Sequence, residues 1–201
     1  MAFETIVLMR DRVVQTRLLE LLQQRSGQEH GFDLSSWMQW IWQTDSPLHP
    51  QYADFKAALY GLIDPRFERY FSSNRVTKIR LTEAVWGGVR QDGIPPLRKP
   101  YMVAAVAAAY LADSDVVFGI EINGDVRAYP KWILAWHEMF VDTVGGQPVA
   151  GVYCTLCGAM IGYYTTHAGV THALGTSGFL YRSKKLMYDQ ATQLLWSTMR
   201  G

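Results

Sequence analysis

The sequence is poor in cysteine, in net charge and in long apolar runs, and each shortage excludes a class of protein. Two cysteines in 201 residues are too few for a disulfide-rich scaffold. With 19 lysines and arginines against 18 aspartates and glutamates, neither a basic surface for nucleic acid nor an acidic surface for cations is indicated. The longest apolar run, residues 102–112, is about half the ~20 residues of a membrane-spanning helix. We therefore expect no nucleic-acid partner and no membrane span in this chain.

The composition is that of a globular protein. Hydrophobic residues make up 49% of the chain and charged residues 18%, which is enough apolar material for a real core. At the N-terminus, Glu4 and Arg10 come too early for the apolar region of a secretory signal. The chain as written is therefore expected to be cytoplasmic, and extracytoplasmic if sequence before residue 1 is missing.

The first 45 residues are predicted to be helical. Residues 4–25 indicate one amphipathic helix, because apolar side chains recur at helical spacing while arginines fall on other faces. Gly27 is expected to end this helix, and Asp33 or Ser35 to cap a second helix that carries Trp37. The stretch GQEHGFDLSSWMQWIWQ is similar to the second half of a HEAT repeat, a partial likeness over residues 4–44. The alternatives are a helical repeat, which cannot bury its faces alone, or one helical hairpin that covers the main domain.

Residues 46–201 are predicted to form a β-rich domain, which makes the chain α+β. A helix over residues 52–63 should end at Asp64-Pro65, and residues 76–81 should form a short strand. Hairpin turns are expected at Asn123-Gly124, at Gly145-Gly146, at Ala168-Gly169 and at residues 189–192. Residues 131–140 are expected to add one or two helical turns between the first two hairpins. The domain should therefore consist of consecutive antiparallel hairpins.

The only two cysteines form a Cys-x-x-Cys pair in the stretch GVYCTLCGAMIGYY. This spacing lets both sulfurs of Cys154 and Cys157 point to one side of a turn, which suits a tetrahedral metal or a small disulfide. A thioredoxin fold would continue from the pair into a helix, whereas GAMIGYYTT continues as a strand, so that fold is excluded. His137 precedes Cys154 by one hairpin, and a hairpin returns to its own start. We therefore expect His137 to lie near the pair.

Five ordered stretches resemble a known family. They are WGGVRQDGIPPL, DVRAYP, WHEMFVDTVGGQPV, YCTLCGAMIGY and GTSGFLYRSKKLMYDQATQLLWS. Over residues 47–201 they are similar to the signature blocks of a prokaryotic family known only as domain of unknown function number 3179, and the resemblance implies no activity. The chain has Asp142 and Lys184 where that family usually has Asn. It stops at Gly201, inside the last block, so the resemblance implies a C-terminally truncated domain with an open edge.

Transition-metal binding in a redox or metal-handling role is the leading functional hypothesis. The proposed ligands are Cys154, Cys157 and His137, with zinc or copper as the metal. Further candidates are Met187, Asp189 and Glu138, and supporting residues are Arg127 and Tyr153. Competing interpretations make Met187 a core residue, pair Arg127 with Asp189 in a buried ion pair, and leave His167 and His172 in solvent.

Two other functions stay open at this point. One is a metal-free dithiol/disulfide oxidoreductase, which needs only a stabilised thiolate. The other is a non-catalytic binding module whose cysteine pair is structural. A protein partner is expected to dock, if at all, on the N-terminal helices or on the open C-terminal edge, where Trp196 should pack inward.

Overall fold

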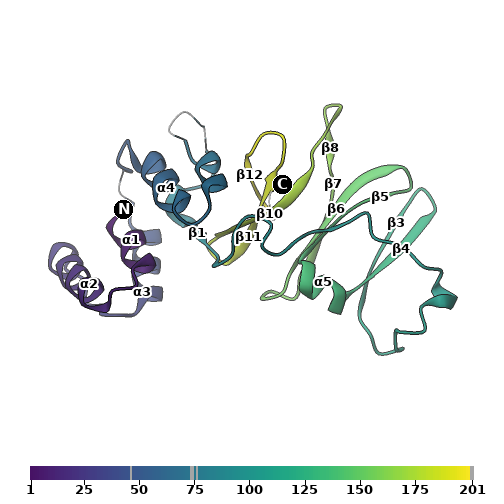
Figure 1. Cartoon of the computed structure of the whole chain (residues 1–201), viewed down its shortest axis with the longest axis horizontal. Helices are drawn as coiled ribbons and strands as arrows, with labels where there is room; N and C mark the ends of the chain where they lie inside the picture. The colour runs from purple at the N-terminus through teal and green to yellow at the C-terminus, as the bar shows by residue number, and fades with distance from the viewer. Residues whose placement is uncertain (46, 73–74, 76, 200–201) are drawn as a thin grey trace. The chain divides into compact units, whose positions relative to one another are not determined.

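The computed structural model describes all residues except 46, 73–74, 76 and 200–201. The chain is α+β, with helices first and antiparallel strands after them (Figure 1). It divides into two compact units, Met1–Glu83 and Ala84–Gly201. The sequence placed the division at residues 45 and 46, the second of which lies outside the described residues, whereas the helix at residues 52–61 belongs to the first unit. In the described part of the chain, none of the helices is both long and apolar enough to cross a membrane.

The first unit is helical. Its elements are α1 Ala2–Leu8, α2 Arg12–Ser26, α3 Leu34–Gln43, α4 Tyr52–Gly61 and the 3-10 helices η1 Pro65–Tyr70 and η2 Leu81–Glu83. The prediction of a single helix over residues 4–25 is wrong. Asp11 interrupts it, because its carboxylate accepts hydrogen bonds from the backbone N–H groups of Val13 and Val14 and so begins a new helix.

Two of the predicted helix boundaries are confirmed, and one predicted strand is absent. Gly27 ends α2 in the left-handed conformation with φ 70°, and Asp33 caps α3. Residues 77–80 are irregular and continue into η2, so the strand expected at residues 76–81 is wrong for residues 77–81, while residue 76 lies outside the described part. Here the Arg80 guanidinium donates to the carbonyls of Trp42 and Thr44, at 3.0 and 2.8 Å. These bonds hold the segment against the end of α3 instead of in a sheet.

The second unit is built from strands that follow the predicted hairpins. One sheet has the order β1-β10-β11-β12 and contains β1 Ala84–Trp86, β10 Leu174–Tyr181, β11 Lys184–Asp189 and β12 Leu195–Ser197. The other has the order β2-β5-β6-β7 and contains β2 Leu97–Arg98, β5 Met139–Val144, β6 Gln147–Cys154 and β7 Ala159–Tyr164. Two separate hairpins are β3 Val117–Ile122 with β4 Asp125–Pro130, and β8 Thr166–His167 with β9 Val170–Thr171. The helix α5 Lys131–His137 and the 3-10 helix η3 Ala105–Ala107 complete the unit.

Alternation along β5 and β6 buries the central sheet on both faces. One face carries Met139, Ala150 and Val152, which pack against Leu174 and Met187 of the β10–β11 sheet. The opposite face carries Phe140, Val144, Val149 and Tyr153, which pack against the β3–β4 hairpin and α5. Because successive side chains of a strand point to opposite faces, the unit has three layers, with β5–β7 in the middle (Figure 1).

One strand pair departs from the predicted antiparallel pattern. β2 pairs with β5 in parallel, whereas the other described pairs are antiparallel. β12 lies at the edge of its sheet and pairs with β11 on one side. Trp196 of this strand is partly buried against the Met139–Met187 core, as its aromatic character predicts.

Gly151 of β6 gives the ring of Phe140 room to lie flat on the central sheet. Phe140 stacks on Tyr129 with ring centroids 3.8 Å apart, and a Cβ at position 151 would overlap the Phe140 ring. We expect Gly151→Ala to lower the free energy of unfolding by about 1–3 kcal/mol, because overpacking forces side chains off their rotamers. Urea unfolding measures this loss. Gly162→Ala is the control, since Gly162 faces Gly151 across the β6–β7 pair and its added Cβ meets no atom within 4 Å. Equal losses in the two variants would contradict the packing argument.

Candidate redox site at the β6–β7 turn

The two cysteines close the turn of the β6–β7 hairpin. Cys154 is the last residue of β6 and pairs with Ala159, the first residue of β7. Residues 155–158 form the turn, in which the Cys157 N–H donates to the Cys154 carbonyl at 3.2 Å and Gly158 takes φ 64°. The sulfurs are joined in a disulfide with Cα atoms 5.2 Å apart. The pair therefore lies in a turn between two strands. A thioredoxin fold would instead place it at the start of a helix, so the exclusion of that fold agrees with the structure.

The two sulfur-bearing residues differ in exposure. Cys154 is half-buried at the end of β6, whereas Cys157 is exposed in the turn. Leu156 between them is 83% exposed, and Thr155 and Gly158 are exposed as well. A reactant from solvent therefore reaches the sulfur of Cys157 more readily than that of Cys154.

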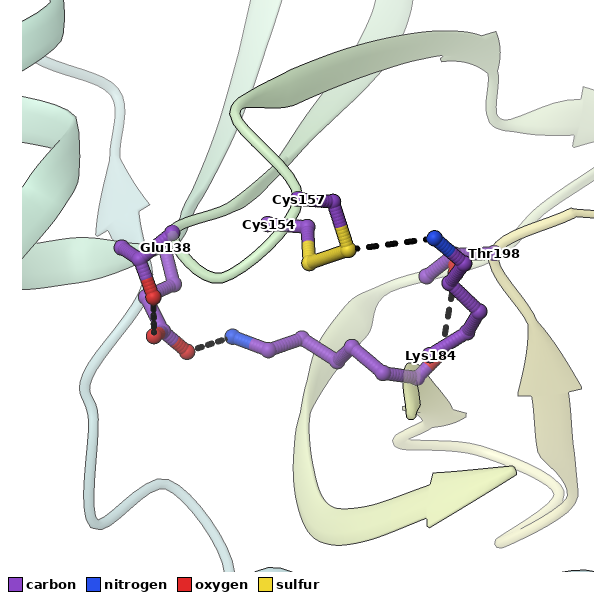
Figure 2. The surroundings of a disulfide bond; sticks show 7 residues. Glu138, Cys154, Cys157, Lys184 and Thr198 are labelled. Atoms are coloured by element: carbon purple, nitrogen blue, oxygen red, sulfur yellow. Dashed lines mark hydrogen bonds and ion pairs between the residues drawn. A yellow bond between two sulfur atoms is a disulfide. The ribbon is translucent and has the colours of Figure 1, made fainter. Parts of the chain in front are cut away.

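A lysine from the other sheet faces the disulfide. Lys184 begins β11, and its ammonium group lies 3.2 Å from the sulfur of Cys157 (Figure 2). A cation at this distance stabilises a thiolate relative to a thiol once the disulfide is reduced. In the sequence, Lys184 stands out only as a departure from the family pattern. Its position 27 residues beyond Cys157 gives no local signal of the contact.

Glu138 connects the cysteine turn to Lys185, the neighbour of Lys184 on β11. It follows α5 in the left-handed conformation with φ 53°, and its carbonyl accepts the N–H of Tyr153 at 2.9 Å. One carboxylate oxygen accepts the hydroxyl of Thr155 at 3.1 Å, and the other pairs with the ammonium of Lys185. Burial lowers the pKa of Lys185, and the hydrogen bond and charge of Glu138 oppose that shift. The carboxylate thus links the turn to the start of β11.

His137 points its Nδ1 to a different partner. That atom lies 2.8 Å from the carbonyl oxygen of Pro95, in the loop before β2. The hairpin does return Tyr153 to the start of β5, as predicted, but the residue that reaches the cysteine turn is Glu138. Within the described ranges, no three or more His, Cys, Asp and Glu side chains are grouped so that they could hold a metal ion.

Met187 and Asp189, the remaining ligand candidates, are fully buried on β11. Met187 packs in the core between the two sheets. Asp189 accepts hydrogen bonds from the hydroxyl and N–H of Thr192 at 2.6 and 3.0 Å. Although burial raises its pKa, the hydrogen bonds from Thr192 and His172 lower it overall. The expectation that His172 is solvated is wrong, because its ring lies 4.7 Å from that of Trp196 and its Nδ1 lies 3.4 Å from Asp189.

Arg127 and Tyr153 support the fold beside the site. The predicted ion pair between Arg127 and Asp189 is wrong. Arg127 on β4 pairs with Asp125 at 2.9 Å and with Asp142 at 2.6 Å, because β3–β4 packs on the face of β5 opposite to β11. The hydrogen bonds that Arg127 donates to these two carboxylates raise its pKa. Tyr153 is buried against Phe118, with ring centroids 5.2 Å apart.

Comparison with known proteins gives one family and no characterised relative. No curated protein and no solved structure matches the chain. One family matches residues 91–201, which contain the hairpins, the cysteine turn and Lys184. Residues 47–90, to which the sequence resemblance also extended, lie outside this match, as do residues 4–44, for which a likeness to a HEAT repeat was predicted. Because the match spans more than half of the chain, the chain belongs to the family described as protein of unknown function (DUF3179).

Proposed function

We propose that Cys154 and Cys157 are a redox-active pair that exchanges electrons with the thiols or disulfides of other molecules. One observation carries the proposal: the disulfide closes an exposed turn, and the ammonium of Lys184 lies 3.2 Å from the sulfur of Cys157, the more exposed of the two cysteines. Reactive cysteines typically occupy electropositive and partly exposed surroundings, whereas structural cysteines are buried. This environment favours exchange over a purely structural disulfide.

The different exposure of the two sulfurs assigns their roles. In the reduced protein, the thiolate of exposed Cys157 attacks one sulfur of a substrate disulfide, forming a mixed disulfide and releasing the other substrate sulfur as a thiolate. Cys154 then attacks the sulfur of Cys157, which restores the Cys154–Cys157 disulfide and releases the second substrate thiolate. Two electrons pass to the substrate, and the protons of the two thiols go to the released thiolates. A second dithiol would reduce the protein again by the reverse steps.

Glu138 is proposed as a positioning residue. It accepts the hydroxyl of Thr155 inside the turn and pairs with Lys185, the neighbour of Lys184. By holding both partners, one carboxylate fixes the turn against the start of β11. The ammonium of Lys184 then faces Cys157 without having to be ordered at each reaction.

Metal handling is the second candidate, with zinc or copper as the metal. The observation that favours it is the placement of both sulfurs on one side of an exposed turn, which after reduction would leave two thiolates available. The other predicted ligands have different partners: Pro95 for His137, Thr192 for Asp189 and Lys185 for Glu138. Redox exchange needs none of them, so it ranks first. The non-catalytic binding module ranks third.

A redox titration of the full chain tests the proposal. The protein is equilibrated in dithiol/disulfide buffers, its free thiols are alkylated, and the oxidised fraction is counted by mass spectrometry. We expect a reversible two-electron transition with a midpoint between roughly −120 and −270 mV, the range of known exchange proteins. A midpoint below about −300 mV would indicate a structural disulfide.

Elemental analysis of the reduced protein, purified without chelator, separates the second candidate from the first. One equivalent of zinc or copper that is lost when both cysteines are replaced by serine would support metal handling. A reversible transition in protein that binds no metal in this assay would support exchange.

A further inference from the structure

We infer that the cysteine turn exchanges disulfides with polypeptides whose reacting cysteine is flanked by apolar residues, an inference that rests on the proposed exchange function. The reason is a stripe of exposed apolar side chains that leads to the reacting sulfur. The stripe consists of Leu156 in the cysteine turn, Trp136 and Trp132 on α5, and Tyr110 in the loop before β3.

Leu156 forms the end of this apolar stripe at the disulfide. It is the residue next to Cys157, and its side chain is 83% exposed. A substrate whose sulfur reaches Cys157 must bring the residues beside its own cysteine up to this leucine. An apolar side chain of the substrate gains free energy there, because the contact removes apolar surface of both molecules from water. The position of Leu156 therefore favours substrates with apolar residues beside the sulfur.

The helix α5 continues the apolar stripe away from the turn. Trp132 and Trp136 are four residues apart, so they lie on the same face of the helix, and they are 48% and 80% exposed. Leu134, between them in the sequence, is buried in the core against the central sheet. The tryptophan face ends near the disulfide, because Glu138, two residues after Trp136, accepts the hydroxyl of Thr155 in the cysteine turn.

Tyr110 adds a third aromatic ring to the apolar stripe. It is 56% exposed, and its ring packs edge-on against Trp132 with centroids 6.3 Å apart. Exposed Trp and Tyr rings dominate binding to polypeptides, because they bury a large area at a low cost in side-chain entropy. Three such rings offer contacts to several side chains of a polypeptide, whereas a small disulfide reaches only the turn. A lipid bilayer would also cover the rings, but it carries no sulfur to place at Cys157.

The reaction is the exchange described above, with the polypeptide held on the stripe. The thiolate of Cys157 attacks the sulfur of the polypeptide, and the other half of the substrate disulfide leaves as a thiolate. Cys154 then attacks the sulfur of Cys157 and releases the polypeptide thiolate. Two electrons pass to the substrate, the protons of the two thiols go to the released thiolates, and a separate dithiol reduces the protein again. Docking raises the rate of the first attack, because it holds the two sulfurs together.

Three disulfides serve as probes of the reduced full chain. Two are uncharged peptides of equal length that carry one cysteine blocked as a mixed disulfide with 2-mercaptoethanol, flanked either by leucine and phenylalanine or by serine and glutamine. The third is the small hydroxyethyl disulfide. Rates of formation of oxidised protein are measured by acid quench and mass spectrometry, and each is divided by the rate of the same probe with dithiothreitol. We expect the apolar peptide to react at least about tenfold faster than the polar one, the factor that burial of one leucine side chain supplies.

Variants of the apolar stripe locate the source of the preference. Leu156→Ser and Trp136→Ser should each lower the ratio of the two peptide rates by at least about threefold, and the double variant should bring it close to one. The ratio within one variant is the readout, so a slower overall reaction does not obscure the result. Leu62→Ser, which changes a leucine that is 86% exposed in the first unit, is the control and should keep the wild-type ratio.

The outcomes distinguish the inference from the function beneath it. Equal rates for the two peptides, or a ratio unaffected by the double variant, would overturn the apolar preference while leaving exchange intact. Failure of all three probes, including hydroxyethyl disulfide, would overturn both. Sedimentation with phosphatidylcholine vesicles tests the lipid alternative. Equal peptide rates together with vesicle binding that Trp136→Ser abolishes would overturn the inference and assign the stripe to a lipid surface.

Discussion

Replacing Cys154 with serine should convert the protein into a trap that holds its substrate through Cys157. In this variant the exposed thiol can still attack a disulfide, but no second thiol is present to resolve the mixed disulfide. We expect Cys154→Ser to accumulate about one equivalent of mixed disulfide with hydroxyethyl disulfide. The wild type should release both halves of the probe. Intact-mass spectrometry after acid quench reads the adduct directly.

Cys157→Ser is the matched variant, because it removes the same atom from the other end of the turn. Its remaining thiol, Cys154, is half-buried and is not the sulfur that Lys184 contacts. We expect this variant to form adduct at least about tenfold more slowly, since both access and thiolate stabilisation are lost. Equal rates in the two variants would contradict the assignment of Cys157 as the nucleophile. Absence of adduct in both would contradict exchange altogether.

A second large effect, on stability, is expected in the first unit, at its buried lysine. Lys56 of α4 is fully buried, and its ammonium pairs with the carboxylate of Glu4 on α1. The same ammonium lies 5.1–5.6 Å from the ring centroids of Tyr52, Tyr60 and Phe71. Burial lowers the pKa of Lys56, and the charge of Glu4 opposes that shift. The carboxylate is thus what offsets the cost of burying the charge.

Glu4→Gln should therefore destabilise the first unit by about 3–5 kcal/mol, the usual cost of removing one partner of a buried ion pair. The cation–π contacts with the three rings are already present in the wild type, so they do not replace the lost ion pair. Native-state hydrogen exchange of peptides from α1 and α4 measures the loss in this unit separately from the β-rich unit.

The double variant Glu4→Gln/Lys56→Met is the control for this prediction. It removes the buried charge together with its partner, and such replacements are often neutral or stabilising. We expect it to recover most of the stability lost in Glu4→Gln. A loss below about 1 kcal/mol in the single variant, or an equal loss in the double variant, would show that the pair does not govern the stability of this unit.

Turn and capping residues in the sequence predicted several element boundaries correctly. Asn123-Gly124 and Gly145-Gly146 mark hairpin turns, and the structure places turns there between β3 and β4 and between β5 and β6. Gly27 and Asp33 mark helix ends for a similar reason, since their conformation or side chain acts on backbone groups a few residues away. Asp11 carried the same kind of signal, and the apolar periodicity of residues 4–25 concealed it.

The packing of the two sheets governs which side chains meet at the cysteine turn. The prediction that His137 lies near Cys154 rested on one hairpin. A hairpin sets the register of the backbone, but it does not set the direction of a side chain beyond its end. His137 contacts the carbonyl oxygen of Pro95, and Glu138 is the residue that bonds to the cysteine turn. Lys184 reaches Cys157 because the core around Met139 and Met187 packs one sheet on the other. Contacts across such a core depend on the packing of two sheets, which no local pattern of residues encodes.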